Sequence, residues 1–169
     1  MSALPHPASG AVPSQDETHQ RMHALLSTVT AAALDEQPGL GGFHDHRPER
    51  DRSSGDSWRG LQTLCHVSAL LTSAGRPEAS ATATARLIDV ADSIATAHGL
   101  HRRSDRARSG VTSLRWTNTA GDLLEVVIGV RVAVRAISAP FLPGSLAPMA
   151  TTSPVSALSP LTPPPRLVR

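Results

Sequence analysis

Lysine and tyrosine are absent from this chain of 169 residues, and aromatic side chains make up only 2% of it. All 16 basic residues are arginine, against 14 acidic residues, so the net charge is only +2. Because neither lysine nor tyrosine is present to titrate between histidine and arginine, the sequence pI of about 9.9 overstates any tendency to bind nucleic acid or membranes. We interpret the missing lysine as the codon bias of a GC-rich genome.

The core has to be built with very few aromatic side chains. Hydrophobic residues make up 40% of the chain, which is enough to fill one modest core but not two. The aromatic residues are Phe43, Trp58, Trp116 and Phe141, so we expect alanine, valine and leucine to provide most of the packing. The composition therefore indicates one domain with an aliphatic core, and it does not by itself identify a function.

Cysteine is scarce as well, because Cys65 is the only one. A single cysteine excludes an intrachain disulfide framework and a cysteine-based zinc cluster. Cys65 and His66 are not expected to act as nucleophile and base, since adjacent side chains point apart in both helices and strands. We expect Cys65 in the core instead. The sequence also contains no hydrolase, zinc-protease or nucleotide-binding motif, so we expect a protein that is not an enzyme and takes no cofactor.

Targeting and membrane signals are missing too. The first twenty residues contain neither an apolar run nor a basic start. The most hydrophobic stretch, residues 123–137, contains three charged residues and is too short to cross a bilayer. By default we expect a soluble, cytoplasmic protein. Residues 1–13 and 143–169 are rich in proline and small residues and are expected to be disordered, the second segment as a native tail or as a frameshift product.

Two helices are indicated by apolar residues spaced three and four apart. Ser14 and Glu17 have the spacing of a capping box, and the apolar stripe that follows predicts a helix over about residues 15–36. Pro77 suits the first turn of a second helix, which Gly99 is expected to end as a left-handed cap. The first stripe consists of Met22, Leu25, Leu26, Val29, Ala32 and Ala33.

The segment between the two helices has a weaker pattern. Charge, glycine and serine dominate residues 39–60, so we expect a long, mobile loop there. Residues 61–71 are apolar but short. Their pattern is ambiguous between helix and strand and slightly favours a helix.

The strongest strand signal lies near the C-terminus. Residues 114–117 alternate between apolar and polar side chains, and residues 118–122 carry turn chemistry. A longer strand is expected over residues 124–136, in which Gly129 marks a bulge or pairing with a further strand. Its apolar face consists of Leu124, Val126, Ile128, Val130, Val132, Val134 and Ala136. The two strands predict an antiparallel hairpin.

Metal-ligand chemistry is suggested at one place, the segment His44-Asp45-His46. Alternate residues of an extended segment can present two imidazoles to one ion, with His66 or an acidic residue of the loop as a third ligand. Two histidines in an arginine-rich loop are more often solvated, however. We therefore expect no metal site, and His44, His46 and His66 are weak candidates.

A nucleic-acid-binding accessory protein is the alternative function. Arginines crowd residues 102–108, in the link between the second helix and the hairpin, and others lie on the polar face of the hairpin. No aromatic residue shares that face for base stacking, and no nucleic-acid-binding motif is present. The candidate contacts are Arg102, Arg103, Arg106, Arg108, Arg115, Arg131 and Arg135.

The order of these elements resembles small actinobacterial cell-envelope lipoprotein-type domains of unknown function. The resemblance covers about residues 16–145 and depends on the helix ending in HGL at residues 98–100 and on the hairpin closed by Gly121-Asp122. It carries over no functional residue. The chain lacks the signal peptide and lipid-anchored cysteine of such proteins and a partner for Cys65. The resemblance implies the cell envelope if the true start lies upstream, and the cytoplasm otherwise.

Together these observations predict an α+β domain over residues 14–142. Two helices are expected to pack on a small antiparallel sheet centred on the C-terminal hairpin and to bury the valines of its second strand, Val130 included. We expect a non-enzymatic binding or interaction module, whose partner is an unidentified protein or small ligand.

Overall fold

The computed structural model describes residues 12–144, so nearly all of the two segments predicted to be disordered lies outside the described residues. The elements in chain order are α1 (Gln15–Glu36), the short 3-10 helix η1 (Pro38–Leu40), β1 (Phe43–Arg47), β2 (Arg50–Trp58), β3 (Leu61–Val67), β4 (Leu70–Ser73), α2 (Ala81–Ala97), β5 (His101–Arg108), β6 (Val111–Thr117), β7 (Leu123–Ile128) and β8 (Val132–Ile137).

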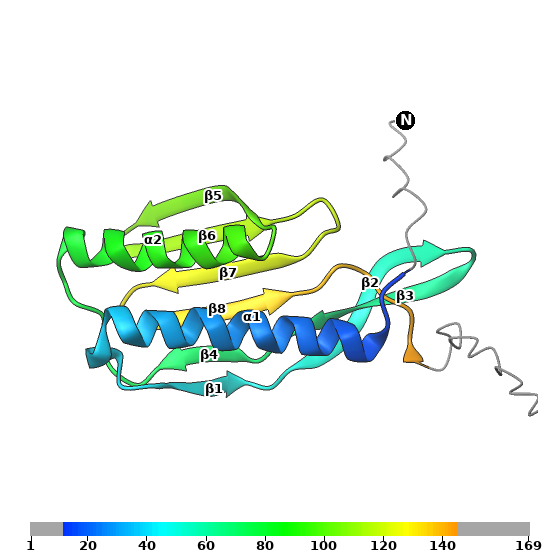
Figure 1. Ribbon diagram of the computed structural model, residues 1–169, viewed down its shortest axis with the longest axis horizontal. Coiled ribbons are helices and arrows are strands. Elements are labelled where there is room, and N and C mark those ends of the chain that lie inside the picture. The colour runs from blue at the N-terminus through cyan, green and yellow to red at the C-terminus, as the bar shows by residue number, and fades with distance from the viewer. Residues whose placement is uncertain (1–11, 145–169) are drawn as a thin grey trace, which may run out of the picture.

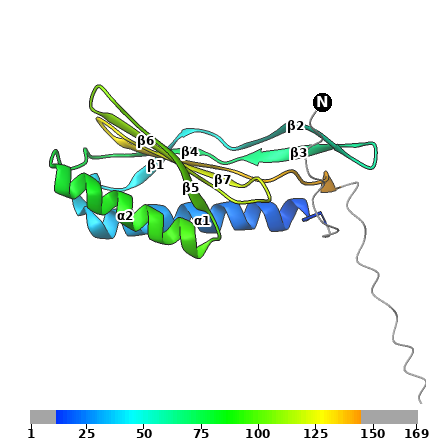
Figure 2. The same ribbon diagram turned by 90° about the horizontal axis from the view of Figure 1, so that it is seen from above.

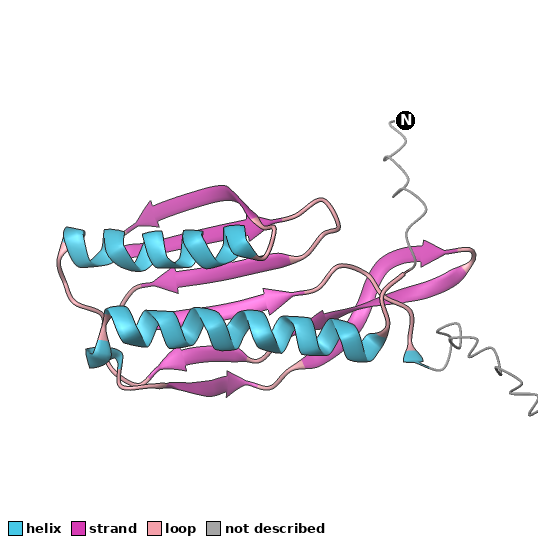
Figure 3. Cartoon of the chain, viewed as in Figure 1, coloured by secondary structure: helices cyan, strands magenta, loops and turns pink. Residues whose placement is uncertain are grey.

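Both α-helices cover the same face of one antiparallel sheet, as Figures 1 and 2 show from two directions. The strand order is β1-β4-β8-β7-β6-β5, while β3 pairs with β8 and with β2. The β2–β3 hairpin projects past the N-terminal end of α1 (Figure 1). The predicted α+β architecture is therefore confirmed. Its sheet has eight strands and extends well beyond the C-terminal hairpin (Figure 3).

Helix α1 begins where its sequence signal places it. The Ser14 side chain accepts a hydrogen bond from the Glu17 backbone N–H at 3.2 Å, and the Glu17 carboxylate accepts one from the Ser14 backbone N–H at 3.1 Å. This reciprocal pair is the predicted capping box. Met22, Leu25, Leu26, Val29 and Ala33 of the stripe are buried against the sheet and α2.

Helix α2 begins four residues later than Pro77. Its N-cap is Ser80, whose side chain accepts a hydrogen bond from the Ala83 backbone N–H at 3.0 Å. The predicted left-handed cap at its other end is confirmed, because Gly99 has a φ of +74°. The next residue, Leu100, is buried, and its backbone N–H donates a hydrogen bond to the Ala95 carbonyl at 2.8 Å. Neither helix of residues 12–144 is long and apolar enough to cross a membrane.

The predicted loop over residues 39–60 is wrong, because that segment contains η1, β1 and β2. The slight preference for a helix over residues 61–71 is also wrong, since β3 and β4 lie there, and the expected link at 102–108 is strand β5. These strands are held by backbone hydrogen bonds, β1 to the more distant β4, β2 to β3 and β5 to β6, the last two as hairpins of consecutive strands. Much of β2 and β5 is exposed, so neither strand needs the apolar alternation that reveals a half-buried strand.

The C-terminal hairpin is confirmed, with Trp116 opposite Leu124 in the β6–β7 pair. The long second strand is instead two strands, because the chain reverses at Gly129 and β8 pairs back onto β7. Ile128 lies opposite Val132, so both strands direct their even-numbered residues to the helices. The alternation of apolar and polar side chains therefore continues through the turn from β7 into β8. Val130 lies at the turn and is 71% exposed, which corrects its predicted burial.

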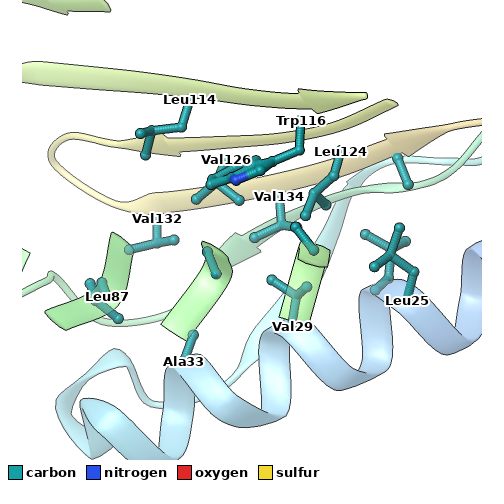
Figure 4. Close-up of a cluster of buried hydrophobic side chains, with 14 of the residues drawn as sticks. Leu25, Val29, Ala33, Leu87, Leu114, Trp116, Leu124, Val126, Val132 and Val134 are labelled. Carbon is teal, nitrogen blue, oxygen red and sulfur yellow. The ribbon is translucent and has the colours of Figure 1, made fainter. Parts of the chain in front are cut away.

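The core lies between the two helices and the inner face of the sheet (Figure 4). Leu25, Val29 and Ala33 come from α1 and Leu87 from α2, and they face the large side chains of the central strands. The labelled sheet residues in Figure 4 are Leu114, Trp116, Leu124, Val126, Val132 and Val134. Trp116 is buried among aliphatic side chains, as the composition predicts, while Trp58 is only partly buried on β2, with Arg59 over its ring. Cys65 is buried, as expected.

On the opposite face of the sheet, Glu125 is the centre of a three-residue ion-pair group. Arg115 donates to one carboxylate oxygen at 2.8 and 2.9 Å, and Arg135 donates to the other. Burial by itself raises the pKa of Glu125, but the hydrogen bonds from Arg115 and then Arg135 outweigh it and leave the pKa below its ordinary value. Glu125 is therefore ionised at neutral pH.

Replacing Glu125 with glutamine is expected to lower the free energy of unfolding by about 1 to 3 kcal/mol at pH 7, because two guanidinium groups lose an ionised acceptor. A lowered folded-state pKa stabilises the protein above the unfolded-state pKa, and this contribution disappears as the pH falls through the folded-state pKa. Urea unfolding should therefore show a difference between wild type and Glu125→Gln that shrinks below about pH 4. The exposed ion pair of Asp105 with Arg102 provides the control Asp105→Asn, with an expected loss under about 1 kcal/mol. A Glu125→Gln deficit that does not change with pH would contradict this account.

Candidate metal centre

The first half of α1 and the base of the β2–β3 hairpin bring three histidines and two carboxylates together. His19 and His23 lie four residues apart on α1 and so share one face of the helix. Glu49 precedes β2, Asp51 lies in β2, and His66 lies in β3. Two overlapping triads form, His19 with Asp51 and His66, and His23 with Glu49 and His66. Within each triad the candidate ligand atoms lie within 4.8 Å of one another.

His66 is at the centre of this cluster, and its side chain is only 1% exposed. Its Nδ1 lies 2.8 Å from Asp51 Oδ1. Asp51 also contacts His19 Nε2 at 3.0 Å, and its second oxygen accepts a hydrogen bond from Gln15 Nε2 at 2.9 Å. The His19 and His66 rings lie beside each other, with centroids 4.1 Å apart. These contacts fix the orientation of the His66 ring.

The other nitrogen of His66 is buried and has no hydrogen-bond partner among residues 12–144. His66 Nε2 lies 3.6 Å from Glu49 Oε2, which is too long for a hydrogen bond. Glu49 Oε2 in turn lies 2.6 Å from His23 Nε2. Two imidazole nitrogens and one carboxylate oxygen therefore converge on one point.

The two carboxylates are held in their ionised form. The hydrogen bond from His23 is the largest cause of the lowered pKa of Glu49. Burial by itself raises the pKa of Asp51, but the hydrogen bonds from His66 and His19 outweigh it and leave the pKa below its ordinary value. An ionised Asp51 only accepts hydrogen bonds, so His66 Nδ1 carries a proton, and the lone pair that a metal would bind is then the one on Nε2. Metal-binding histidines commonly have this arrangement, with a carboxylate behind the ring.

These residues fit a zinc ion. Tetrahedral bonds of about 2.0 to 2.1 Å place ligand atoms about 3.3 Å apart. The 3.6 Å between His66 Nε2 and Glu49 Oε2 is close to that value. The contact between His23 and Glu49 would have to lengthen, and both side chains are about half exposed and so have room to move. His66, His23 and Glu49 would bind the ion, while Asp51 and His19 would orient His66.

The cluster differs from the metal ligands considered from the sequence. His66 belongs to it, but His44 and His46 are exposed on β1 and contribute no atom to either triad. The other four members were missed. The spacing of His19 and His23 on a predicted helix was a usable signal, because residues four apart share a face. Glu49 and Asp51 lay in a segment predicted to be a loop, so nothing in the sequence indicated that they contact the α1 face that carries His19 and His23.

The arginines of the alternative function are mostly engaged in contacts within the protein. Arg102 donates to Asp92 and Asp105, and Arg103 donates to the Thr117 hydroxyl. Arg115 and Arg135 bind Glu125 in the group described above, and Arg131 donates to the backbone carbonyls of Ser73 and Ala74. Arg106 and Arg108 lie on the edge strand β5. Nucleic-acid binding stays a prediction that these contacts do not strengthen.

No protein-family model and no curated protein sequence matches this chain. Its fold resembles that of the "putative lipoprotein LppA" from Mycobacterium tuberculosis, with a TM-score of 0.60 and 10% identity over 82% of this chain and 83% of that one. A DUF4853 family protein from Actinomyces odontolyticus matches with a TM-score of 0.49 and 16% identity, over 83% and 73% of the two chains. At 10% identity, the LppA match confirms the expected resemblance to actinobacterial lipoprotein-type domains as a likeness of fold.

Proposed function

We propose that this domain is a binding module for a divalent transition metal, with zinc as the best fit. The observation that carries the proposal is the Nε2 atom of His66, which is buried, faces Glu49 and has no hydrogen-bond partner within the described part of the chain. A buried polar atom without a partner costs about 1 to 3 kcal/mol. A bound ion would remove that cost by accepting the lone pair.

The donor set also favours zinc over other common ions. Calcium and magnesium prefer sites made entirely of oxygen ligands, whereas His66 and His23 offer nitrogen. Two histidines and one carboxylate form a set that zinc uses in proteins. A purely structural histidine–carboxylate network is the competing explanation, and in it the Nε2 atom of His66 has only the 3.6 Å contact with Glu49.

Metal binding would also join two parts of the chain. His23 belongs to α1, while Glu49 and His66 belong to the base of the β2–β3 hairpin. An ion bound only by the folded form stabilises it, by about 2.7 kcal/mol at a free concentration one hundred times Kd. The proposal is one of binding. The absence of enzymatic activity and the cytoplasmic location, both expected from the sequence, stay predictions.

The test is a zinc titration of protein made without a histidine tag and stripped with a chelator. We expect one zinc ion per chain by calorimetry and elemental analysis, and a rise in Tm on the order of 10 °C at a hundredfold excess over Kd. Asp51→Asn keeps the shape of the side chain but weakens the acceptor behind His66, so we expect zinc affinity to fall by about 10- to 100-fold. Glu49→Gln removes a proposed zinc ligand at a half-exposed position, so we expect its zinc affinity to fall by more than that of Asp51→Asn.

The matched control is the double variant His44→Gln, His46→Gln, which removes two exposed histidines outside the cluster. Its zinc affinity should equal that of the wild type. Equal zinc uptake by this control and by Glu49→Gln would mean that zinc binds elsewhere. Failure of the stripped wild type to take up stoichiometric zinc would overturn the proposal.

A further inference from the structure

A cleft of about 440 Å³ opens beside the candidate metal centre, between α1 and strands β1 and β4. His23 and Glu49, two of the three proposed zinc ligands, form part of its wall. Its volume lies in the range of small-ligand sites. The buried members of the cluster, His66 and the residues behind it, do not line the cleft. The side of the metal centre that meets the cleft is therefore the one formed by His23 and Glu49.

Three protein ligands leave one position of a tetrahedral zinc ion unfilled. Structural zinc sites are closed by four protein ligands, whereas sites with three keep the fourth position for water or an exogenous ligand. Asp51 and His19 do not fill it, because Asp51 is engaged by the Nδ1 of His66 and by His19. An exogenous ligand would reach the fourth position from the cleft, because His23 and Glu49 are the proposed metal ligands that line it.

The cleft lining indicates which ligands would fit. Leu26, Pro48 and Leu71 give it apolar walls, which suit a ligand with an apolar body. Its charged groups are Asp45 and Glu49, both acidic, and no arginine lines it. Glu49 and Asp51 together already balance the charge of a divalent ion. An anionic donor would therefore add negative charge next to Asp45, while a neutral donor would not.

We infer that the fourth position of the metal takes a neutral nitrogen donor, of the imidazole type, whose apolar body occupies this cleft. The inference rests on the proposed metal binding and adds the class of ligand. A free small molecule and a histidine side chain of a peptide offer the same chemistry. Both would enter from the cleft side of His23.

The test uses the protein loaded with Co²⁺, whose visible absorption reports changes in coordination. Titration with 4-methylimidazole should change the spectrum in a saturable way, with an affinity at least ten times higher than for thiocyanate, the anionic probe. Dialysis against the same ligand checks that cobalt stays bound. The tripeptide acetyl-Gly-His-Gly-amide is the second arm: its binding identifies a peptide histidine as the source, and binding of the free ring alone identifies a small molecule.

Ser27 lies one turn beyond His23 and lines the cleft, so Ser27→Phe should fill it. We expect this variant to keep its cobalt and to lose at least tenfold in affinity for 4-methylimidazole. Thr28→Phe adds the same bulk at the adjacent exposed position, which does not line the cleft, and should bind the ring like the wild type. Asp45→Asn should improve thiocyanate binding relative to 4-methylimidazole.

The two proposals fail in different ways. Absence of stoichiometric cobalt and zinc would overturn the metal centre itself. If cobalt binds but 4-methylimidazole leaves the spectrum unchanged, the fourth position holds water alone and the ligand inference is wrong. Equal ring affinity in Ser27→Phe and wild type would also overturn it, because the ring would then not occupy the cleft.

Discussion

Replacing Trp116 with alanine is expected to lower the free energy of unfolding by about 3 to 5 kcal/mol. Trp116 is 1% exposed near the C-terminal end of β6 and is among the largest side chains of the core. The other buried members of its core cluster are aliphatic side chains and one methionine, so the cavity left by the indole would be large relative to its neighbours. The indole N–H also donates to Asp92 on α2, so the variant loses a link between helix and sheet.

Two further substitutions separate these contributions. Trp116→Phe keeps much of the apolar volume but removes the hydrogen bond to Asp92, so we expect a smaller loss than for alanine. Trp58→Ala is the matched control, because Trp58 is only partly buried and has Arg59 over its ring at 4.5 Å. An exposed cation–π contact contributes about 0.5 to 1 kcal/mol. Urea unfolding followed by circular dichroism measures all three, and equal losses for Trp116→Ala and Trp58→Ala would contradict the packing described here.

The second large effect is expected at Gly75, in the link between β4 and α2. A Cβ atom added there would lie 2.0 Å from the Gly39 carbonyl oxygen and 3.1 Å from two backbone carbonyl carbons. The Gly75 backbone N–H also donates to the Leu40 carbonyl at 2.6 Å, so the two backbone segments are held close together. Backbone cannot move aside as a flexible side chain can. We therefore expect Gly75→Ala to cost at least about 3 kcal/mol, the upper end of the range for overpacking.

Gly39→Ala is the matched control, because Gly39 lies on the other side of the same contact. Its added Cβ would meet no atom within 4 Å, and its backbone does not have a positive φ. We expect Gly39→Ala to change the free energy of unfolding by less than about 1 kcal/mol in either direction. Thermal and urea unfolding of the two variants test the contact directly. Similar stability in both would show that the link can shift without cost.

Some parts of the fold could be predicted because their causes are local. The capping box of Ser14 and Glu17 and the left-handed cap at Gly99 involve atoms only a few residues apart. The even-numbered apolar residues of β7 and β8 identify the inner face of the sheet, since side chains alternate in every strand. The same alternation hid the turn at Gly129. Ile128 and Val132 are paired and separated by an even number of positions, so the pattern continues across the reversal.

Other parts depend on pairing that no local pattern reports. Strand β2 consists mostly of charged residues, serine and glycine, and it is a strand because its backbone pairs with β3. Strand β5 is an edge strand rich in arginine and is held by β6 in the same way. Backbone hydrogen bonds depend little on side-chain polarity. Charge and glycine in such a segment are therefore equally compatible with a loop and with an exposed strand.

The sequence by itself determined the capped start of α1, the left-handed cap after α2, the inner face of the C-terminal strands and the absence of an intrachain disulfide, because each depends on neighbouring residues or on composition. Because His19 and His23 lie four residues apart, they share one face of α1. Only the tertiary structure decided that Glu49, 26 residues from His23, and Asp51, 32 residues from His19, meet that face around His66. The pairing of β2 with β3 and the packing of their hairpin against α1 bring these ligands together. That convergence, and the buried Nε2 atom without a partner that it creates, cannot be derived from spacing along the chain.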